Sequence, residues 1–235
     1  MLHLKNAAWL RNNSMKITKE LIGKIEKEAR EFFQDASGCH DWSHVERVRK
    51  MALHVGKLEK ANVQVLEIAS LLHDIGRRDE MKSKGLFCHA EKGAELAIEI
   101  LDRYCIENEM KKEIIHCIFT HRNRTTKKPE SLEAKILFDA DKLDSSGAVS
   151  VARDFLFAGN AGSNCLYTGN EKKLAKSKIN YSYTKEDSAI LEYEINLKYI
   201  KDRMLTNTGK NIAKERHKFM KDFFERFWEE VGGKK

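Results

Sequence analysis

Apolar residues recur every three or four positions along almost the whole chain, which is typical of amphipathic helices. The first such pattern spans positions 17–33, and its apolar members are Ile17, Leu21, Ile25, Ala29, Phe32 and Phe33. Similar patterns predict helices over about 45–55, 65–76, 89–104, 109–121, 131–143, 146–158 and 187–205. Ser43 is the expected N-cap of the second helix, and Gly76 is the expected end of the third.

A last helix is expected to begin near Thr208. We expect its apolar stripe to lie in the core, and the stripe consists of Ile212, Phe219, Phe223, Phe227 and Val231. Nowhere does the sequence show a convincing strand alternation. The predicted fold class is therefore all-α.

The length of 235 residues, 41% of them hydrophobic, suffices for one sizeable core. We expect one helical domain over 16–235, preceded by an N-terminal appendage over 1–15. Residues 159–187 are rich in glycine, asparagine and lysine, which indicates either a lid over a site or an ordinary surface loop. If the segment is a lid, three tyrosines are expected to stack on a nucleotide base: Tyr167, Tyr181 and Tyr183.

Composition narrows the class of protein further. No apolar window is long enough for a membrane span, and the first residues are too polar for a good secretory signal. Five cysteines, an odd number without any C-x-x-C pair, indicate reduced thiols and a cytoplasmic protein. The net charge of +7 favours anionic partners such as phosphates, nucleotides or nucleic acid, although spread lysines also simply keep a protein in solution.

The stretch "SLLHDIG" places an imidazole and a carboxylate side by side in an apolar run. A buried charge is costly unless it is paired or binds a metal. Two further polar residues, His44 and Asp141, also fall on apolar helix faces at the i+4 and i+7 spacing. Taken singly, each has a simpler interpretation as a hydrogen-bonded core histidine or a helix-terminal aspartate. Together with His73 and Asp74, they form a mixed nitrogen and oxygen set that suits a divalent transition metal.

The spacing "HDWSHVERV", "LLHDIGRR" and "DADKLD" closely resembles the HD superfamily of metal-dependent phosphohydrolases. Similarity extends over "HAEKGAELA", "IFTHRN" and "NIAKERHKFM", and it points to a bacterial and archaeal subgroup that includes deoxynucleoside triphosphate pyrophosphohydrolases. Carried over residue by residue, the resemblance implies four metal ligands: His44, His73, Asp74 and Asp141. Members of the subgroup tend to read "DADRLDAxGAxGxAR" where this chain has "DADKLDSSGAVSVAR", so substrate contacts differ more than metal ligands do.

Phosphate hydrolysis requires an activated water and donors for the phosphate oxygens. Asp74 is expected to orient the water, while His89 and His121 are expected to act as phosphate donors, as a general acid or as ligands of a second metal ion. The predicted substrate contacts are Arg77, Arg122, Lys142 and Asp144, with a solvated helix end as the alternative for the arginines.

We therefore expect divalent-metal-dependent hydrolysis of a nucleotide, from (deoxy)nucleoside triphosphate to monophosphate and pyrophosphate. Manganese is the expected ion, iron, cobalt, nickel and zinc are alternatives, and magnesium is less suited. A nucleotide monophosphatase, a cyclic-nucleotide phosphodiesterase and a non-catalytic nucleotide- or nucleic-acid-binding protein remain the competing interpretations. A nucleic-acid partner is disfavoured because no zinc finger or aromatic–basic motif occurs, and the sequence leaves a homodimer open.

Overall fold

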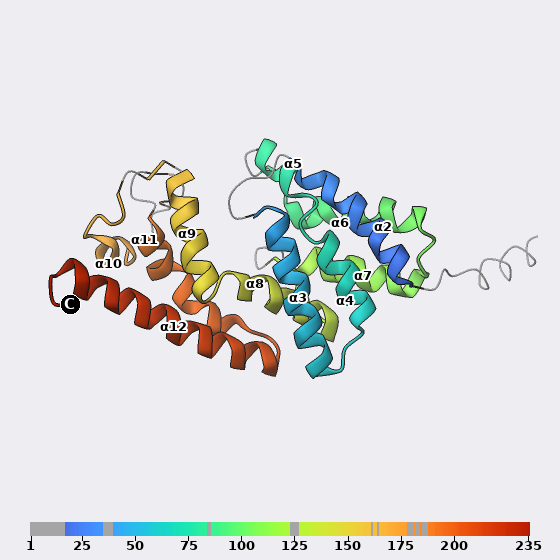
Figure 1. The fold of residues 1–235 in the computed structure, drawn as a ribbon. Helices are drawn as coiled ribbons and strands as arrows, with labels where there is room; N and C mark the ends of the chain where they lie inside the picture. Colours follow the sequence, from blue (N-terminus) through green and yellow to red (C-terminus); the bar gives the residue numbers. More distant parts are fainter. Residues whose placement is uncertain are drawn as a thin grey trace, which may run out of the picture. The chain divides into compact units, whose positions relative to one another are not determined.

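The computed structural model describes residues 17–34, 40–83, 86–122, 127–160, 162–163, 165–177, 181, 184 and 188–235. These residues form helices and turns, with no strand among them, so the all-α prediction is confirmed (Figure 1). The predicted appendage over 1–15 lies outside the described residues. The chain divides into two compact units, one within Met1–Ala36 and Ala52–Phe138, the other within Ser37–Met51 and Asp139–Lys235.

The first unit contains helices from the N-terminal half of the chain. They are α2 (Lys19–Arg30), η1 (Glu31–Phe33), α4 (Val63–Leu72), α5 (Arg77–Lys82), α6 (His89–Arg103) and α7 (Asn108–Thr120). Two more helices contribute residues to both units, and they are α3 (Trp42–Glu59) and α8 (Leu132–Asp144).

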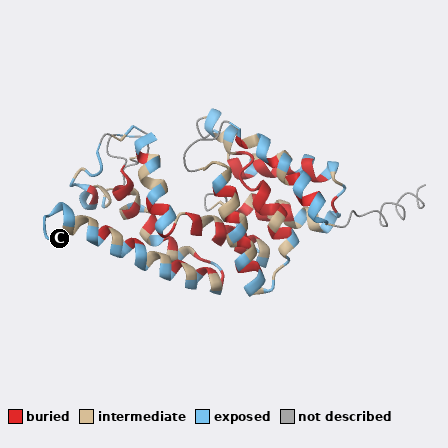
Figure 2. Cartoon of the chain, in the orientation of Figure 1, coloured by how far each residue is buried: buried red, intermediate tan, exposed pale blue. Residues whose placement is uncertain are grey.

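Helix α4 forms the centre of the first unit. Its sequence VQVLEIASLL is apolar on nearly every side, and residues 65–66 and 68–72 are all buried (Figure 2). The side chain of Asn62 caps the helix by accepting from the backbone N–H groups of Gln64 and Val65. Helices α2 and α7 pack against α4, and α7 also packs against α6. The candidate site begins at the C-terminal end of this largely buried helix.

The second unit contains the C-terminal helices. They are α9 (Ala148–Asn160), α10 (Glu171–Leu174), α11 (Ala189–Ile195), η3 (Leu197–Arg203) and α12 (Asn207–Val231). Its buried core consists of Leu143, Val151, Ile190, Tyr193, Leu197, Ile200, Met204, Ala213, Met220 and Phe224. The ring of Tyr193 stacks on that of Phe224, with centroids 4.2 Å apart, and joins α11 to α12.

One predicted cap is wrong because a nearby side chain takes the role. Helix α3 begins at Trp42, and the carboxylate of Asp41, not Ser43, accepts from the backbone N–H of His44 at 3.2 Å. Helix α12 begins at Asn207, as expected near Thr208, and the hydroxyl of Thr206 caps it by accepting from the backbone N–H of Gly209 at 3.0 Å.

The predicted apolar stripe of α12 is also partly wrong. Phe219 and Val231 are 47% and 40% exposed, whereas Ala213, Met220 and Phe224 are buried. The other three members of the predicted stripe, Ile212, Phe223 and Phe227, are partly buried and pack against the core of the second unit. The helix predicted over 187–205 is divided at Asn196 into α11 and the 3-10 helix η3.

Within the described residues, every helix is too short or too polar to cross a bilayer.

Candidate metal centre and active site

The His-Asp pair occupies the turn between α4 and α5. His73 directly follows the last residue of α4, and its Nδ1 donates to the carbonyl oxygen of Ser70 at 2.8 Å. A carbonyl oxygen can only accept, so the ring proton lies on Nδ1 and leaves a lone pair on Nε2. Both His73 and Asp74 are buried, at 0% and 1% exposure. The turn therefore presents an unprotonated imidazole nitrogen next to a carboxylate.

Two further imidazoles come to this turn from the ends of neighbouring helices. His89 is the first residue of α6, and His121 directly follows the last residue of α7. Gly76 allows the turn to approach α6, because a Cβ at this position would collide with the backbone of His89 and Gly93. The prediction that Gly76 ends the third helix is wrong, because α4 already ends at Leu72 and Gly76 directly precedes α5. The sequence needs glycine here for close approach.

Among the described residues of the first unit, Asp74, His89 and His121 form a buried cluster of potential ligand atoms. Asp74 Oδ1 lies 3.3 Å from His89 Nε2 and 3.5 Å from His121 Nε2, and the two Nε2 atoms are 3.2 Å apart. His73 Nε2 lies 3.9 Å from the other carboxylate oxygen of Asp74. The cluster satisfies the distance requirement for a shared metal ion, since its ligand atoms all fall within 4.8 Å of one another.

The hydrogen bonds of the two imidazoles also fit a cation. His121 Nδ1 donates to the carbonyl oxygen of Ile118 at 2.6 Å, and His89 Nδ1 donates to the carboxylate of Glu80 at 2.7 Å. Both partners accept only, so each neutral ring carries its proton on Nδ1. Two Nε2 lone pairs and a carboxylate oxygen then face one another. A divalent cation satisfies such a donor set, and an Nδ1–H bond to a carboxylate or carbonyl is the usual support of a metal-binding histidine.

Burial and neighbouring charges set the protonation states in the cluster. Burial raises the pKa of Asp74, but Arg77 together with His73 and His89 outweighs it and holds this pKa well below its usual range. Burial lowers the pKa of His89 to about 4, against the opposing effects of Asp74 and Glu80. At neutral pH the cluster therefore contains a carboxylate and a neutral imidazole, which are the forms that bind metal ions.

The two predicted substrate arginines of the first unit lie at the edge of the cluster. Arg77 donates to the carboxylate of Asp74 at 3.2 Å and to Glu80 at 3.1 Å. Arg122 donates to the other oxygen of Glu80, and its Nη1 lies 3.7 Å from the sulfur of Cys88. Each guanidinium is 19% exposed and so is reachable from solvent.

The remaining predicted site residues lie in the second unit, where His44 contacts two aspartates of α8. His44 Nδ1 lies 2.7 Å from Asp144 Oδ2, and His44 Nε2 lies 3.4 Å from Asp141 Oδ1. The shorter contact places the proton on Nδ1, so that Nε2 faces Asp141 with a lone pair. Lys142 Nζ pairs with the second oxygen of Asp141 at 2.6 Å. His44 and Asp141 thus form a second pair of potential ligands.

Asp144 has more protein partners than a simple substrate contact requires. Besides His44, its carboxylate accepts from Arg47 Nε at 2.6 Å and from Arg153. Burial raises the pKa of Asp144, but these three partners outweigh it and lower the pKa below its usual range. In this structure Asp144 orients His44 and two arginines.

Sequence reasoning missed three of these residues. Glu80 joins His89, Arg77 and Arg122, while Arg47 and Arg153 converge on Asp144. Arg47 and Glu80 each carried a weak local signal, since they lie three residues after His44 and Arg77 on the same helices. The partners of Glu80 other than Arg77 are distant in sequence, so no local pattern marks its contacts with them.

The described tyrosines of the predicted lid have protein partners. The ring of Tyr167 contacts Phe227 and Trp228 of α12, with centroid distances of 5.8 and 5.3 Å. The Tyr181 hydroxyl lies 2.7 Å from that of Ser177. Tyr183 lies outside the described residues, and the role of 159–187 as a lid stays a prediction.

Comparison with known proteins shows which family the chain resembles. The sequence model of the HD domain matches residues 41–146. The uncharacterized protein YpgQ of Bacillus subtilis is 32% identical over 207 residues, which cover 85% of this chain and 88% of YpgQ.

Two solved structures are also similar to this chain over most of their length. The crystal structure of Bacillus subtilis YpgQ in complex with ADP matches with a TM-score of 0.68 and 27% identity, over 90% of this chain and 95% of that one. An HD-superfamily hydrolase from Bacillus thuringiensis matches with a TM-score of 0.69 and 28% identity, over 91% of this chain and 98% of that one.

Proposed function

The chain belongs to the HD domain family and is a metal-dependent phosphohydrolase, and we propose that its substrate is a nucleotide. In the proposed reaction, water attacks the α-phosphorus of a (deoxy)nucleoside triphosphate, and the products are the monophosphate and pyrophosphate. The observation that carries the proposal is the buried cluster of Asp74, His89 and His121, with two arginines at its edge. The arginines can bind the anionic phosphate oxygens. The carboxylate and the imidazoles can accept the proton that the attacking water loses during hydrolysis.

On the strength of the sequence resemblance, we propose four metal ligands: His44, His73, Asp74 and Asp141. His89 and His121 are the alternative ligands, with Asp74, of a second ion. The donor set of imidazole nitrogen and carboxylate oxygen suits manganese, iron, cobalt, nickel or zinc. When bound, a divalent ion supplies charge stabilisation to the phosphate and lowers the pKa of water.

The chain's own residues supply proton transfer and phosphate binding. If no second ion binds there, the Nε2 of His89 or His121 takes the proton of the attacking water, because the ring proton of each lies on Nδ1 and Nε2 carries a lone pair. Arg77 and Arg122 bind phosphate oxygens from the edge of the cluster, and Lys142 adds a third cation. We assign Asp144 to the orientation of His44, in addition to any substrate contact.

The nucleotide class is supported by charge and by a relative. The chain carries a net charge of +7, which favours a polyanionic substrate. The related YpgQ was crystallised with ADP. A monophosphatase or a cyclic-nucleotide phosphodiesterase would use the same residues, so the released product must decide among them.

The first prediction concerns Asp74→Asn. We expect the purified wild-type protein to contain about one equivalent of transition metal and to release pyrophosphate from one or more nucleoside triphosphates. The variant should lose both the metal and turnover, because an amide is a weaker ligand than a carboxylate. The substitution also removes one of the two carboxylates that pair with Arg77. Metal content by mass spectrometry, and phosphate and pyrophosphate release from a nucleotide panel with added Mn²⁺, measure the two effects.

Asp79→Asn is the matched control, since Asp79 lies on the same short helix but lines a separate surface cavity. It should keep both metal and turnover. Release of inorganic phosphate alone would identify a monophosphatase, and opening of a cyclic nucleotide would identify a phosphodiesterase. Full activity of Asp74→Asn would refute the proposed site.

A further inference from the structure

Glu80 receives donors from three different elements. On its own helix α5, Arg77 Nη1 donates to Oε2 at 3.1 Å. At the start of α6, His89 Nδ1 donates to the same oxygen at 2.7 Å. After the end of α7, Arg122 donates to Oε1. The carboxylate is 14% exposed and is thus held mostly by protein.

The protonation state of Glu80 determines what it can do for His89. The guanidinium groups of Arg77 and Arg122 both donate to this carboxylate, and two cations beside it keep it ionised. An ionised carboxylate accepts hydrogen bonds and donates none. His89 must therefore carry its proton on Nδ1 as long as this contact exists.

The other ring nitrogen of His89 then has a defined direction and a lone pair. It points to Asp74 Oδ1 at 3.3 Å and to His121 Nε2 at 3.2 Å. The opposite tautomer would place the ring hydrogen on Nε2, between His89 and His121. Nε2 could then neither bind a cation nor accept a proton from water. The Glu80 carboxylate, which lies outside the cluster, thus determines whether His89 Nε2 presents a lone pair to the cluster beside that of His121 Nε2.

We propose that Glu80 is a positioning residue that fixes His89 in its Nδ1–H form and thereby directs the Nε2 lone pair into the cluster. The same carboxylate holds Arg77 and Arg122 at the edge of the cluster. The inference rests on the proposed function only in that His89 belongs to the active site. Partners of this kind orient metal-binding histidines, and their loss typically costs about 10- to 100-fold in metal affinity or activity.

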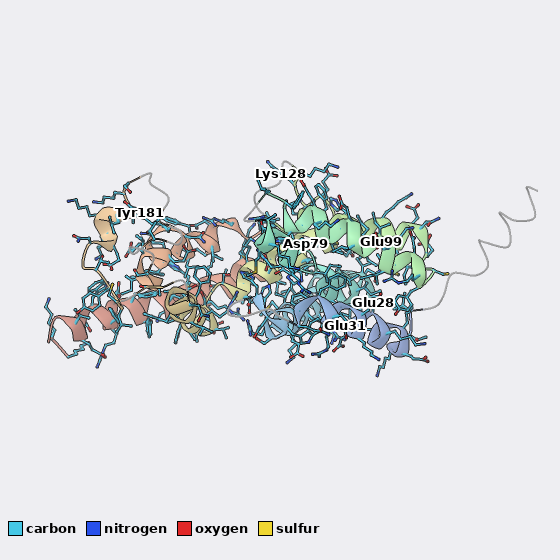
Figure 3. All side chains as sticks on the ribbon, turned by 90° about the horizontal axis from the view of Figure 1, so that it is seen from above. Glu28, Glu31, Asp79, Glu99, Lys128 and Tyr181 are labelled. Carbon is cyan, nitrogen blue, oxygen red and sulfur yellow. The ribbon has the colours of Figure 1, made fainter. Side chains whose placement is uncertain are left out.

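Asp79 offers a matched comparison on the same helix. It precedes Glu80 directly, and its side chain, labelled in Figure 3, lines a surface cavity of about 560 Å³ together with Lys82, Phe87 and Lys92. Substitution of Asp79 removes one negative charge from α5, as substitution of Glu80 does, but leaves the contacts of the Asp74–His89–His121 cluster in place.

The test uses metal-free, ¹⁵N-histidine-labelled protein and two substitutions, Glu80→Met and Asp79→Met. Methionine keeps the length of the glutamate side chain and removes both acceptor oxygens. In a two-bond ¹H–¹⁵N correlation spectrum, we expect His89 as the Nδ1–H tautomer in the wild type and in Asp79→Met. In Glu80→Met, a substantial fraction should change to Nε2–H.

Titration with Mn²⁺ by calorimetry gives a second measurement. We expect Glu80→Met to bind Mn²⁺ about 10- to 100-fold more weakly than the wild type, and Asp79→Met to bind it equally well. If Glu80→Met does not fold, Glu80→Ala serves instead, with Asp79→Ala as its control, because alanine also removes both acceptor oxygens. The inference is overturned if the folded variant keeps the Nδ1–H tautomer or the wild-type affinity.

These results are separate from the proposed reaction. A wild-type protein that hydrolyses no nucleotide would refute the proposed function, while the tautomer in metal-free protein would still test the role of Glu80.

Discussion

Asp154 is an aspartate that neighbouring cations do not keep ionised. Burial raises its pKa to about 7, and the nearby charge of Glu192 adds to this effect. Arg153 and a hydrogen bond from the Ser150 hydroxyl at 3.3 Å oppose the rise without cancelling it. Asp74 is buried as well, yet it is ionised because Arg77 contacts it directly. Whether a buried aspartate is a charge or a neutral acid thus depends on which cations lie beside it.

The raised pKa predicts how stability changes with pH. Unfolded aspartate has a pKa near 3.9, so between about pH 4 and pH 7 the folded protein retains a proton that the unfolded chain loses. The contribution of Asp154 to the free energy of unfolding should therefore fall as pH rises through this window and level off above pH 7. His89, whose pKa burial lowers to about 4, contributes in the opposite direction, so the effect of Asp154 is measured as a difference between the wild type and a variant. A pKa difference of one between the folded and unfolded states is worth about 1.4 kcal/mol, so the total loss has an upper limit of a few kcal/mol.

Asp154→Asn should remove this loss. We expect the variant to be more stable than the wild type at pH 8 and to lose that advantage near pH 5, as measured by urea unfolding. Asp222→Asn, the same change on an exposed part of α12, is the control and should follow the wild type at both pH values. A wild-type and an Asp154→Asn protein with parallel pH dependence would show that Asp154 is ionised throughout.

At the scale of elements, the close approach of the 73–76 turn to α6 depends on Gly76. Its φ of −82° is open to any residue, so the requirement for glycine is steric. A Cβ would meet backbone atoms of His89 and Gly93, which cannot rotate away as a side chain does. Any displacement would separate Asp74 from His89.

Gly76→Ala should therefore lower the free energy of unfolding by about 1–3 kcal/mol, the usual cost of overpacking, and weaken Mn²⁺ binding. Gly23→Ala is the matched control, because Gly23 is a helical glycine of α2 with nothing within 4 Å of its Cβ position. That change should raise the free energy of unfolding by roughly 0.5–1 kcal/mol. Urea unfolding and calorimetric titration check both, and wild-type stability in Gly76→Ala would contradict the steric argument.

The helices themselves were predictable because their apolar spacing is local. Expected helices at 89–104 and 109–121 correspond to α6, His89–Arg103, and α7, Asn108–Thr120. Local patterns also singled out His73 and Asp74 as polar residues in an apolar run, and both are buried. The spacing of apolar residues indicates which face of a helix is buried. A histidine or aspartate on that face therefore stands out from its apolar neighbours in the sequence.

What the sequence could not predict depends on contacts between distant residues. The buried face of α12 was predicted only in part because Phe219 and Phe224 are equally apolar, and only packing decides which faces the core. Glu80 was missed because Arg122 lies 42 residues away. From sequence alone, a charged residue on a short helix cannot be distinguished from a solvent-exposed one, because its partners come from other elements of the fold.

At the scale of the whole molecule, net charge determines how a polyanionic substrate is attracted. The chain carries 43 lysines and arginines against 36 acidic residues. Charges of one sign raise the association rate of oppositely charged ligands, and salt screens them with a Debye length of about 10 Å at 0.1 M. We therefore expect kcat/KM for a nucleoside triphosphate to fall several-fold as ionic strength rises from about 0.01 to 0.1 M, with kcat at saturation unchanged.

A phosphodiester that carries a single charge, bis(p-nitrophenyl) phosphate, is the control substrate for steady-state assays across this salt range. Its kcat/KM should fall less steeply, because the attraction scales with the charge of the ligand. An equal decline for both substrates would mean that salt acts on the enzyme or its metal affinity. A constant kcat/KM for the triphosphate would mean that local contacts such as Arg77 and Arg122, and not the field of the whole chain, govern substrate capture.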